Sequence, residues 1–416
     1  MTRQVEFPVS GIRNKMEEKF DVIVIGGGVI GCAAAYFLSA NTSFNGSVLV
    51  VEPDPTHTHA SSTLSASSLR TQFSNSLNIK ISQYGYDFIS HFHDLMSVNG
   101  DKPFLKFHEG GYLFLAKSDL QVEIMRQNNS VQLANNADVV LWSTSELANA
   151  FPHVNVTDIK LASYGKSGEG WFDNVGFLNG FKRKAQDLGA KFLKDEVVGF
   201  NKNKKVIESI NLKSGKKICS GHFVNATGAR AAKIAAYAGI DVPVAPRKRT
   251  VFVFDCENSP QGSASVNNGS LPLMVDNTGV YCRPEGSYFI TGCVPTNDVD
   301  VDYDDFTPNY AEFDDIIWPA LANRSKYFEA IKVKNYWAGH YAYNVIDQNM
   351  ILGCHPEVKN FYFANGFSGH GLQQAPATGR ALSELITHGE YRSLDLSPFC
   401  FERILEKKPF IEKAIV

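Results

Sequence analysis

A glycine pattern near the start of the chain, Gly26-x-Gly28-x-x-Gly31, constrains the fold more than any other feature. The β-branched run 22–25 precedes it and predicts a strand, and the small residues 32–35 follow it and predict a helix. In such a unit the first glycine makes the tight turn, the second lets backbone approach a pyrophosphate, and the third lets helix pack on strand. Free N–H groups at the helix N-terminus suit phosphate oxygens. The run therefore predicts a dinucleotide-binding α/β domain.

A carboxylate at the end of the next apolar run narrows the choice of nucleotide. Residues 47–52 predict a second strand that ends in Glu52, about 20 residues past Gly31, which is the spacing for gripping a ribose hydroxyl. An acid at this position fits an unphosphorylated adenosine ribose and so indicates FAD or NAD rather than NADP. The alternative is a glycine turn in some other α/β protein.

Length and charge exclude several classes of protein. A chain of 416 residues is too long for one small core, which favours two domains. The hydrophobic content of 44% and charged content of 20% are typical of a globular protein. The net charge of −3 and the lack of a basic segment exclude nucleic acid as an expected partner. No apolar run reaches the ~18 residues of a transmembrane segment.

The cysteines and histidines predict no metal site and no disulfide framework. The seven cysteines are scattered, odd in number and without a C-x-x-C pair, and the histidines lack the spacing of metal ligands. This usage indicates a reducing compartment. The first 19 residues mix basic and acidic side chains, so they are interpreted either as a short targeting segment or as an untargeted tail.

Two later segments repeat the arrangement of strand, glycine turn and helix. One apolar strand ends at Asn225-Ala-Thr-Gly228, and another, residues 361–364, runs into the glycine-rich segment 365–374. A helix is expected to start at Pro376, since proline suits a first helical turn. One helix N-terminus can hold a pyrophosphate, and the other can face a ring that becomes anionic on reduction. This favours FAD over a nicotinamide. Further helices are expected over 77–96, 177–188, 229–238 and 313–322.

Taken in this order, the motifs resemble the FAD-dependent amine oxidoreductases of the D-amino-acid oxidase/sarcosine oxidase superfamily, over roughly residues 20–400. The resemblance implies an α/β fold with a glutathione-reductase-type Rossmann-like FAD-binding domain, interleaved with an α+β substrate domain that holds a large mixed sheet. The implied bounds are 1–19 for the N-terminal tail, 20–100, 165–245 and 340–400 for the FAD-binding domain, 101–164 and 246–339 for the substrate (cap) domain, and 401–416 for a C-terminal tail.

The same resemblance implies the residues that bind FAD. They are Gly26, Gly28, Val29, Ile30, Gly31, Glu52, Ser61, Ser62, Thr63, Val197, Ala226, Thr227, Gly228, Gly366, Ser368, Gly369, His370, Gly371, Leu372 and Gln373. Relatives with covalent flavin have a histidine in the early loop or a cysteine before the last glycine motif. Here those positions are interpreted as Ser65 and His340, which predicts noncovalent FAD.

The implied activity is hydride transfer from a C–N bond of an amino acid or N-methyl amine to flavin N5. Arg70 is expected to bind the substrate carboxylate, because its fork suits bidentate contacts; the alternative is a structural ion pair. His370 is expected to contact the flavin, or else to pack as a hydrogen-bonded histidine. His340 and Tyr343 are expected on the substrate face, or else in the core. These four residues are the predicted catalytic set.

Two departures from the family refine this expectation. Sarcosine oxidases have an oxygen-activating lysine in a late strand, whereas the comparable segment 287–293 has none, which favours a dehydrogenase. They also have a carboxylate-binding lysine where this chain has Gln373, so that a carboxylate would depend mainly on Arg70. An NAD-dependent dehydrogenase that shares only the nucleotide fold stays an alternative.

A narrower resemblance covers the segments 62–74, 343–349, 366–376 and 394–399. They are similar to a mitochondrial group of assembly factors for respiratory complex I and its bacterial relatives. This implies a mitochondrial location, in the matrix or peripheral to the inner membrane, and complex I subunits or assembly factors as partners. The location would be cytoplasmic if the N-terminus is not a targeting signal. In the alternative function that follows, FAD is structural and the protein acts in assembly without turnover.

Overall fold

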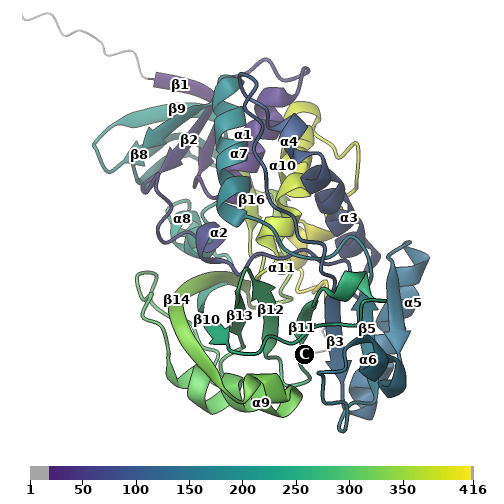
Figure 1. The fold of residues 1–416 in the computed structure, drawn as a ribbon. Coiled ribbons are helices and arrows are strands. Elements are labelled where there is room, and N and C mark those ends of the chain that lie inside the picture. Colours follow the sequence, from purple (N-terminus) through teal and green to yellow (C-terminus); the bar gives the residue numbers. More distant parts are fainter. Residues whose placement is uncertain (1–17, 414–416) are drawn as a thin grey trace, which may run out of the picture.

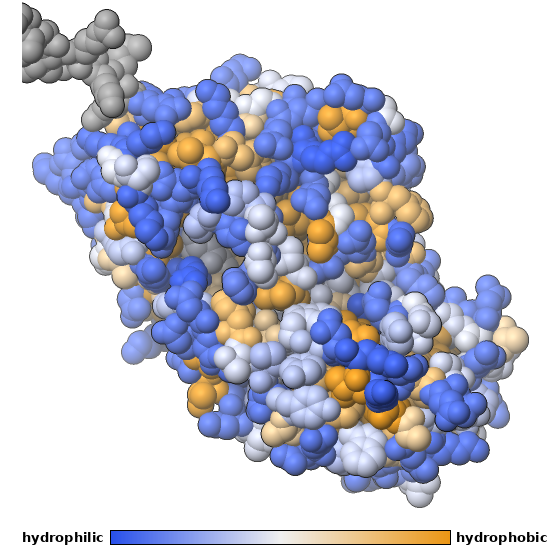
Figure 2. Space-filling view, turned by 60° about the vertical axis from the view of Figure 1, so that its left-hand side comes forward, coloured by the Kyte–Doolittle hydropathy of each residue, from blue (hydrophilic) through white to orange (hydrophobic). Residues whose placement is uncertain are grey.

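The computed structural model describes residues 18–413, which form two lobes, each built on one large sheet (Figure 1). Most of the expected N-terminal tail lies outside the described residues, and Glu18 and Lys19 already belong to the first strand. No helix within residues 18–413 is long and apolar enough to cross a bilayer. On the face drawn in Figure 2, apolar side chains gather in several separate patches among polar ones.

The first sheet has the order β15-β16-β9-β1-β2-β6, with β8 and β7 continuing from β9. The strands β16, β9, β1, β2 and β6 run parallel. Side chains alternate along β1, so that Val22 and Val24 enter one core and Ile23 and Ile25 the core on the opposite face. The strands are β1 (Glu18–Ile25), β2 (Val48–Glu52), β6 (Lys191–Lys194), β7 (Val197–Asn203), β8 (Val206–Leu212), β9 (Lys217–Asn225), β15 (Ile351–Cys354) and β16 (Phe361–Asn365).

The second sheet has the order β14-β10-β13-β12-β11-β3-β5-β4 and is mostly antiparallel. Aromatic residues of β10 and β13 pack beneath α9 on its outer face. The strand β14 runs unbroken through residue 340, where a domain boundary was predicted. The strands are β3 (Tyr112–Ala116), β4 (Val139–Trp142), β5 (Leu161–Gly165), β10 (Val244–Cys256), β11 (Leu273–Val275), β12 (Tyr281–Glu285), β13 (Tyr288–Gly292) and β14 (Ile331–Asn344).

Helices cover both sheets, and α1, α3, α7 and α10 pack together beside the first one (Figure 1). The α-helices are α1 (Val29–Ala40), α2 (Ser61–Leu64), α3 (Ser76–Ser90), α4 (Phe92–Leu95), α5 (Asp119–Ala134), α6 (Thr144–Ala150), α7 (Asn174–Asp187), α8 (Ala231–Ala236), α9 (Trp318–Arg324), α10 (Gly371–His388) and α11 (Glu402–Leu405). Short 3₁₀ segments are η1 (Gly228–Arg230), η2 (Asn267–Gly269), η4 (Lys326–Phe328) and η5 (Ser397–Phe399), and η3 (Phe313–Ile317) is a π-helical segment.

Several expected helix bounds were wrong. The helix expected to start at Pro376 begins at Gly371 and holds Pro376 inside. Backbone with positive φ at Gly366, Ser368 and Gly369 reverses the chain just before it, so the helix begins as soon as the turn ends. The helix expected over 77–96 is two helices, and that over 313–322 joins η3 to α9. The expected C-terminal tail contains α11.

Candidate cofactor and substrate site

The first glycine turn is packed so closely that two of its positions require glycine. Gly26 has φ +98°, and a Cβ there would lie 2.5 Å from the Ala226 carbonyl oxygen. A Cβ on Gly31 would overlap the Gly26 carbonyl oxygen. At Gly28 a Cβ would approach only the Ser62 hydroxyl, at 3.3 Å. The turn is therefore closed toward the protein at Gly26 and Gly31, and open at Gly28.

Glu52, the predicted ribose-binding residue, ends β2 beside the first glycine turn. Its carboxylate accepts the Gly27 N–H (2.7 Å) and the Asp54 N–H (2.8 Å), so β2 holds it against the glycine turn. Burial raises the pKa of Glu52, and the two backbone donors oppose that rise. The side chain is fixed beside the N-terminus of α1, as a ribose-binding carboxylate requires.

At the starts of α1 after Gly28, α2 after Ala60 and α10 after His370, the N-cap residue makes no side-chain hydrogen bond to the helix. Their first N–H groups are the donors that an anionic ligand uses at a helix N-terminus. The hydroxyl of Ser62 in α2 accepts the Val29 N–H of α1 at 3.0 Å, which joins two of these N-termini.

The other predicted FAD residues divide into donors and supports. The hydroxyls of Ser61 and Thr63 donate to the carbonyl groups of His340 (2.6 Å) and His57 (2.5 Å). Ser368 Oγ accepts the Asn344 N–H at 3.0 Å and thus secures the last glycine turn to β14. Three further residues lie beside the first glycine turn. The Ala226 N–H donates to the Ile25 carbonyl, and the Thr227 hydroxyl donates to the Asn225 side chain. Gly228 begins η1. Val197 begins β7 and is buried; Ile30, Gly371 and Leu372 lie in the first turns of α1 and α10.

Gln373, in the first turn of α10, provides a test of whether the site fits a cofactor. Its Oε1 accepts the Arg70 N–H at 2.8 Å, whereas its Nε2 is buried without a hydrogen-bond partner. Buried polar atoms without partners are rare in native proteins. An orphaned amide donor beside the uncapped start of α10 fits a ring edge with carbonyl and nitrogen acceptors, as isoalloxazine has.

The structure brings the predicted residues Arg70 and His370 into contact. Arg70 Nη2 lies 3.0 Å from His370 Nε2, and Nη1 donates to the Gln72 carbonyl at 2.7 Å. Because arginine only donates, His370 Nε2 is the acceptor and the other ring nitrogen bears the proton. Burial and the neighbouring Arg70 charge lower the pKa of His370 to about 3. His370 is therefore a neutral acceptor that orients Arg70.

The side chains of His340 and Tyr343 lie on opposite faces of β14. Side chains of β14 alternate in direction. The His340 ring stacks on Phe306 (4.2 Å between centroids), and its Nε2 lies 2.8 Å from the Asp305 carbonyl oxygen. The next side chain, Tyr341, contacts Gly369 instead. Tyr343 shares the side of Tyr341 and lies under the Arg247 guanidinium.

Sequence reasoning missed a group of tyrosines on the second sheet, one of which lies near Arg70. Tyr112 of β3, Tyr281 of β12 and Tyr341 of β14 lie close enough to influence one another electrostatically, and Tyr112 also lies near Arg70. Burial raises the pKa of Tyr112 and Tyr281, so both are neutral phenols. Arg249 lies over the Tyr341 ring at 5.0 Å. The three tyrosines come from strands that are far apart in the sequence. Their proximity could therefore be predicted only from the order and register of the strands in the second sheet.

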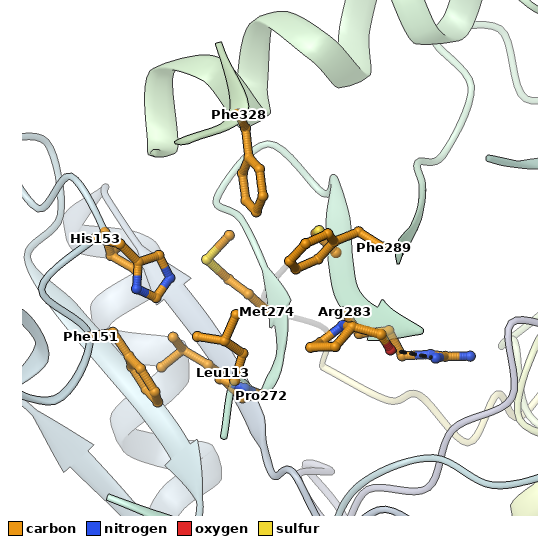
Figure 3. Close-up of a pocket in the computed structure, with 12 residues that line it drawn as sticks. Leu113, Phe151, His153, Pro272, Met274, Arg283, Phe289 and Phe328 are labelled. Atoms are coloured by element: carbon orange, nitrogen blue, oxygen red, sulfur yellow. Dashed lines mark hydrogen bonds between the residues drawn. The ribbon is translucent and has the colours of Figure 1, made fainter. Parts of the chain in front are cut away.

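A small cavity lies on the opposite face of the second sheet and does not belong to this site. Its volume of about 20 Å³ has room for roughly one water. Figure 3 shows the His153 ring pointing into it, with Phe289 and Phe328 across from it. Leu113 lines this cavity. Its side chain lies on the opposite face of β3 from those of Tyr112 and Phe114.

Taken together, the Rossmann-type turn, the fixed Glu52 carboxylate beside it and the uncapped α10 start fit a flavin-dependent oxidoreductase. The family model for FAD dependent oxidoreductases of the DAO type matches residues 21–385. The chain belongs to this family and is FAD-dependent.

Comparison with relatives agrees with this assignment. FAD-dependent oxidoreductase domain-containing protein 1 of Xenopus laevis is 38% identical over 96% of this chain and 85% of its own. Human mitochondrial dimethylglycine dehydrogenase is 24% identical over 94% of this chain, which spans 46% of that protein. Among solved structures, the L-proline dehydrogenase from P. horikoshii has a TM-score of 0.82 at 26% identity, covering 95% of this chain and 100% of that one.

Proposed function

We propose that this protein oxidises a C–N bond of an amino acid or N-methyl amino acid, with Arg70 binding the substrate carboxylate. One observation supports this most directly. Within residues 18–413, no carboxylate lies in ion-pair distance of Arg70, whereas the buried Arg283, Arg324 and Arg403 each pair with at least one. A partly buried guanidinium without a counter-charge is suited to an anionic ligand.

The residues around Arg70 leave donors for that ligand. Two of its five N–H donors are used by Gln72 and His370, and no other hydrogen bond to the guanidinium comes from the described part of the chain. The guanidinium also stacks over Phe73 (4.3 Å) and Phe114 (5.4 Å). These rings exclude water, which strengthens a bond between Arg70 and a carboxylate.

The remaining groups favour a substrate whose amine is neutral. Bound FAD supplies the hydride acceptor for such a substrate. His370, Tyr112 and Tyr281 offer no base near neutral pH, because the imidazole pKa is lowered and the phenol pKa values are raised. The uncapped N–H groups of α10 can stabilise negative charge that develops beside them. We therefore expect kcat/KM to rise with pH through the pKa of the substrate amine.

The experiment is an anaerobic panel of α-amino acids and N-methyl amino acids, followed by loss of flavin absorbance. Bleaching by at least one carboxylate-bearing amine, and none by the matching amine without carboxylate, supports the proposal. No bleaching across the panel contradicts it. We also propose that FAD is noncovalent and that a dehydrogenase activity prevails, since β13 has no lysine. Acid precipitation should release the flavin, and reoxidation should be faster with an artificial acceptor than with oxygen.

A second candidate function is a role in assembly of respiratory complex I in mitochondria, with structural FAD. The observation that favours it is the ranking of relatives. Identity is 38% to a protein whose name states no substrate, and only 22–24% to the named sarcosine and dimethylglycine enzymes. Affinity purification from mitochondria tests it: complex I subunits should co-purify, and a variant lacking Arg70 should support assembly as well as wild type.

A further inference from the structure

A buried carboxylate behind the substrate site has no role in the function proposed above. Glu169, in the loop between β5 and α7, has none of its surface exposed. Its Oε1 accepts both the N–H and the hydroxyl of Thr71, each at 2.7 Å, and its Oε2 accepts Gln72 Nε2 at 2.8 Å. These donors belong to the two residues that follow Arg70.

The same loop also holds the residue before Arg70. Leu69 and Gly170 exchange two backbone hydrogen bonds, of 2.8 and 2.9 Å, in an isolated β-bridge. The segment 69–72 is thus fixed by the loop on both sides of Arg70. Arg70 itself then points away from the loop, toward His370.

The Gln72 side chain cannot turn over to accommodate a change at position 169. Its Nε2 also donates to the Tyr112 carbonyl, and its Oε1 accepts the Ser163 hydroxyl at 2.6 Å. A flipped amide would lose both bonds. An amide in place of the Glu169 carboxylate must therefore set a donor against a donor, at Thr71 or at Gln72.

From this geometry we infer that Glu169 is a positioning residue for substrate binding, which fixes the Thr71–Gln72 backbone and so aims the Arg70 guanidinium at the substrate carboxylate. Gln72 completes the connection, because its carbonyl accepts Arg70 Nη1. The inference rests on the proposed function and assigns to that site a residue that contacts neither substrate nor cofactor.

The test is a titration of the FAD-loaded full chain with benzoate and with benzamide, followed by the flavin absorbance spectrum. Glu169→Gln should raise the dissociation constant for benzoate at least about tenfold, because one buried hydrogen bond is no longer made. The dissociation constant for benzamide should change by no more than about twofold. Glu384→Gln is the matched control, since Glu384 is also buried and accepts a backbone N–H and a serine hydroxyl, at Arg392 and Ser393. It should leave both affinities unchanged.

A double-mutant cycle separates positioning from general stability. In an Arg70→Gln background, Glu169→Gln should not weaken benzoate further, although any loss of thermal stability should persist. If Glu169→Gln fails to fold, Thr71→Val is the alternative, since it loses only the hydroxyl hydrogen bond. It should lower the affinity for benzoate about threefold and leave the affinity for benzamide unchanged.

The outcomes distinguish this inference from the proposed function. The positioning role is refuted, and the carboxylate site stands, in either of two cases in which wild type binds benzoate. In the first, Glu169→Gln binds benzoate as tightly as wild type does. In the second, it loses the same factor of affinity for benzoate and for benzamide. If wild type binds benzoate no better than benzamide, both fail.

Discussion

At the scale of single residues, substrate affinity is expected to depend most on Arg70. Arg70→Gln removes the only charge proposed to meet a substrate carboxylate, and charge-assisted hydrogen bonds contribute about 1.5–3 kcal/mol each. We expect the dissociation constant for benzoate to rise by about 10- to 100-fold, with FAD content unchanged. Arg126→Gln, on the exposed side of α5, is the control. An unchanged benzoate affinity would show that the anion binds elsewhere.

His370 is expected to affect stability rather than the pH profile of catalysis. Its pKa is about 3 in the folded protein and about 6.5 in an unfolded chain. Below pH 6.5 the unfolded state therefore binds a proton that the folded state does not, and stability falls as the pH falls from 6.5 toward 3.

The variant His370→Asn should lessen that loss. Between pH 7.5 and 5, urea unfolding should show up to about 2 kcal/mol less destabilisation than in wild type. His93→Asn, at an exposed position on α4, is the control. If the free energy of unfolding falls equally steeply with falling pH in wild type and in His370→Asn, His370 is not a neutral histidine in the folded protein.

At the scale of elements, the start of α1 is expected to decide whether FAD is retained. Gly28→Glu adds a carboxylate on the side of the turn that is open to a ligand, where it would repel a pyrophosphate. Purified Gly28→Glu should be colourless with a far-ultraviolet circular dichroism spectrum like that of wild type. Ala40→Glu adds the same charge at the far, exposed end of α1 and should stay yellow. Retained flavin in Gly28→Glu would place the pyrophosphate elsewhere.

Elements with a strong local signal were predicted well, and those set by tertiary contacts were not. The spacing of Gly26, Gly31 and Glu52 reports local backbone demands, so strand, turn and helix could be predicted around them. The start of α10 could not, because Ser368, a residue that rarely adopts positive φ, adopts it in the preceding turn, where it is hydrogen-bonded to Asn344 of β14. Pro376 was accordingly taken for a first-turn residue.

At the scale of the whole molecule, stability of the second lobe is expected to depend on a buried ion-pair network. Arg324, at the end of α9, donates to Asp276 (2.6 Å), Asp158 (2.9 Å) and Asn277 (2.9 Å). Arg324→Met leaves the buried Asp276 without its partner, which typically costs about 3–5 kcal/mol.

The melting temperature followed by protein fluorescence should drop by several degrees in Arg324→Met, with the flavin spectrum of the folded protein unchanged. Adding Asp276→Asn should recover part of the loss, because it removes the uncompensated charge. Arg392→Met, at an exposed position, is the control. A melting temperature equal to that of wild type would show that the network is not stabilising.

Only part of the candidate site could be predicted from the sequence. The residues in or beside the glycine motifs of the first lobe could be predicted, and those contributed by the second lobe could not. Arg70 and His370 lie in or beside recognisable motifs, so both could be proposed. Tyr112, Tyr281 and Glu169 come from segments without a recognised motif. Tyr112 and Tyr281 meet because the second sheet pairs β3 with β11 and β11 with β12, and Glu169 follows β5, which pairs with β3. The faces of β14 on which His340 and Tyr341 lie could not be predicted, because one residue of register decides which face of a strand a side chain takes.

That register has an evolutionary consequence. The Asn344 end of β14 is bonded to the last glycine turn, and the strand, which begins at Ile331, forms one edge of the second sheet. A one-residue deletion between these ends, compensated in the loop before Ile331, would replace the Tyr341 phenol beside Gly369 with the His340 imidazole without moving any flavin-binding segment. Chemical diversity among homologues could thus arise from insertions and deletions far from the reacting atoms.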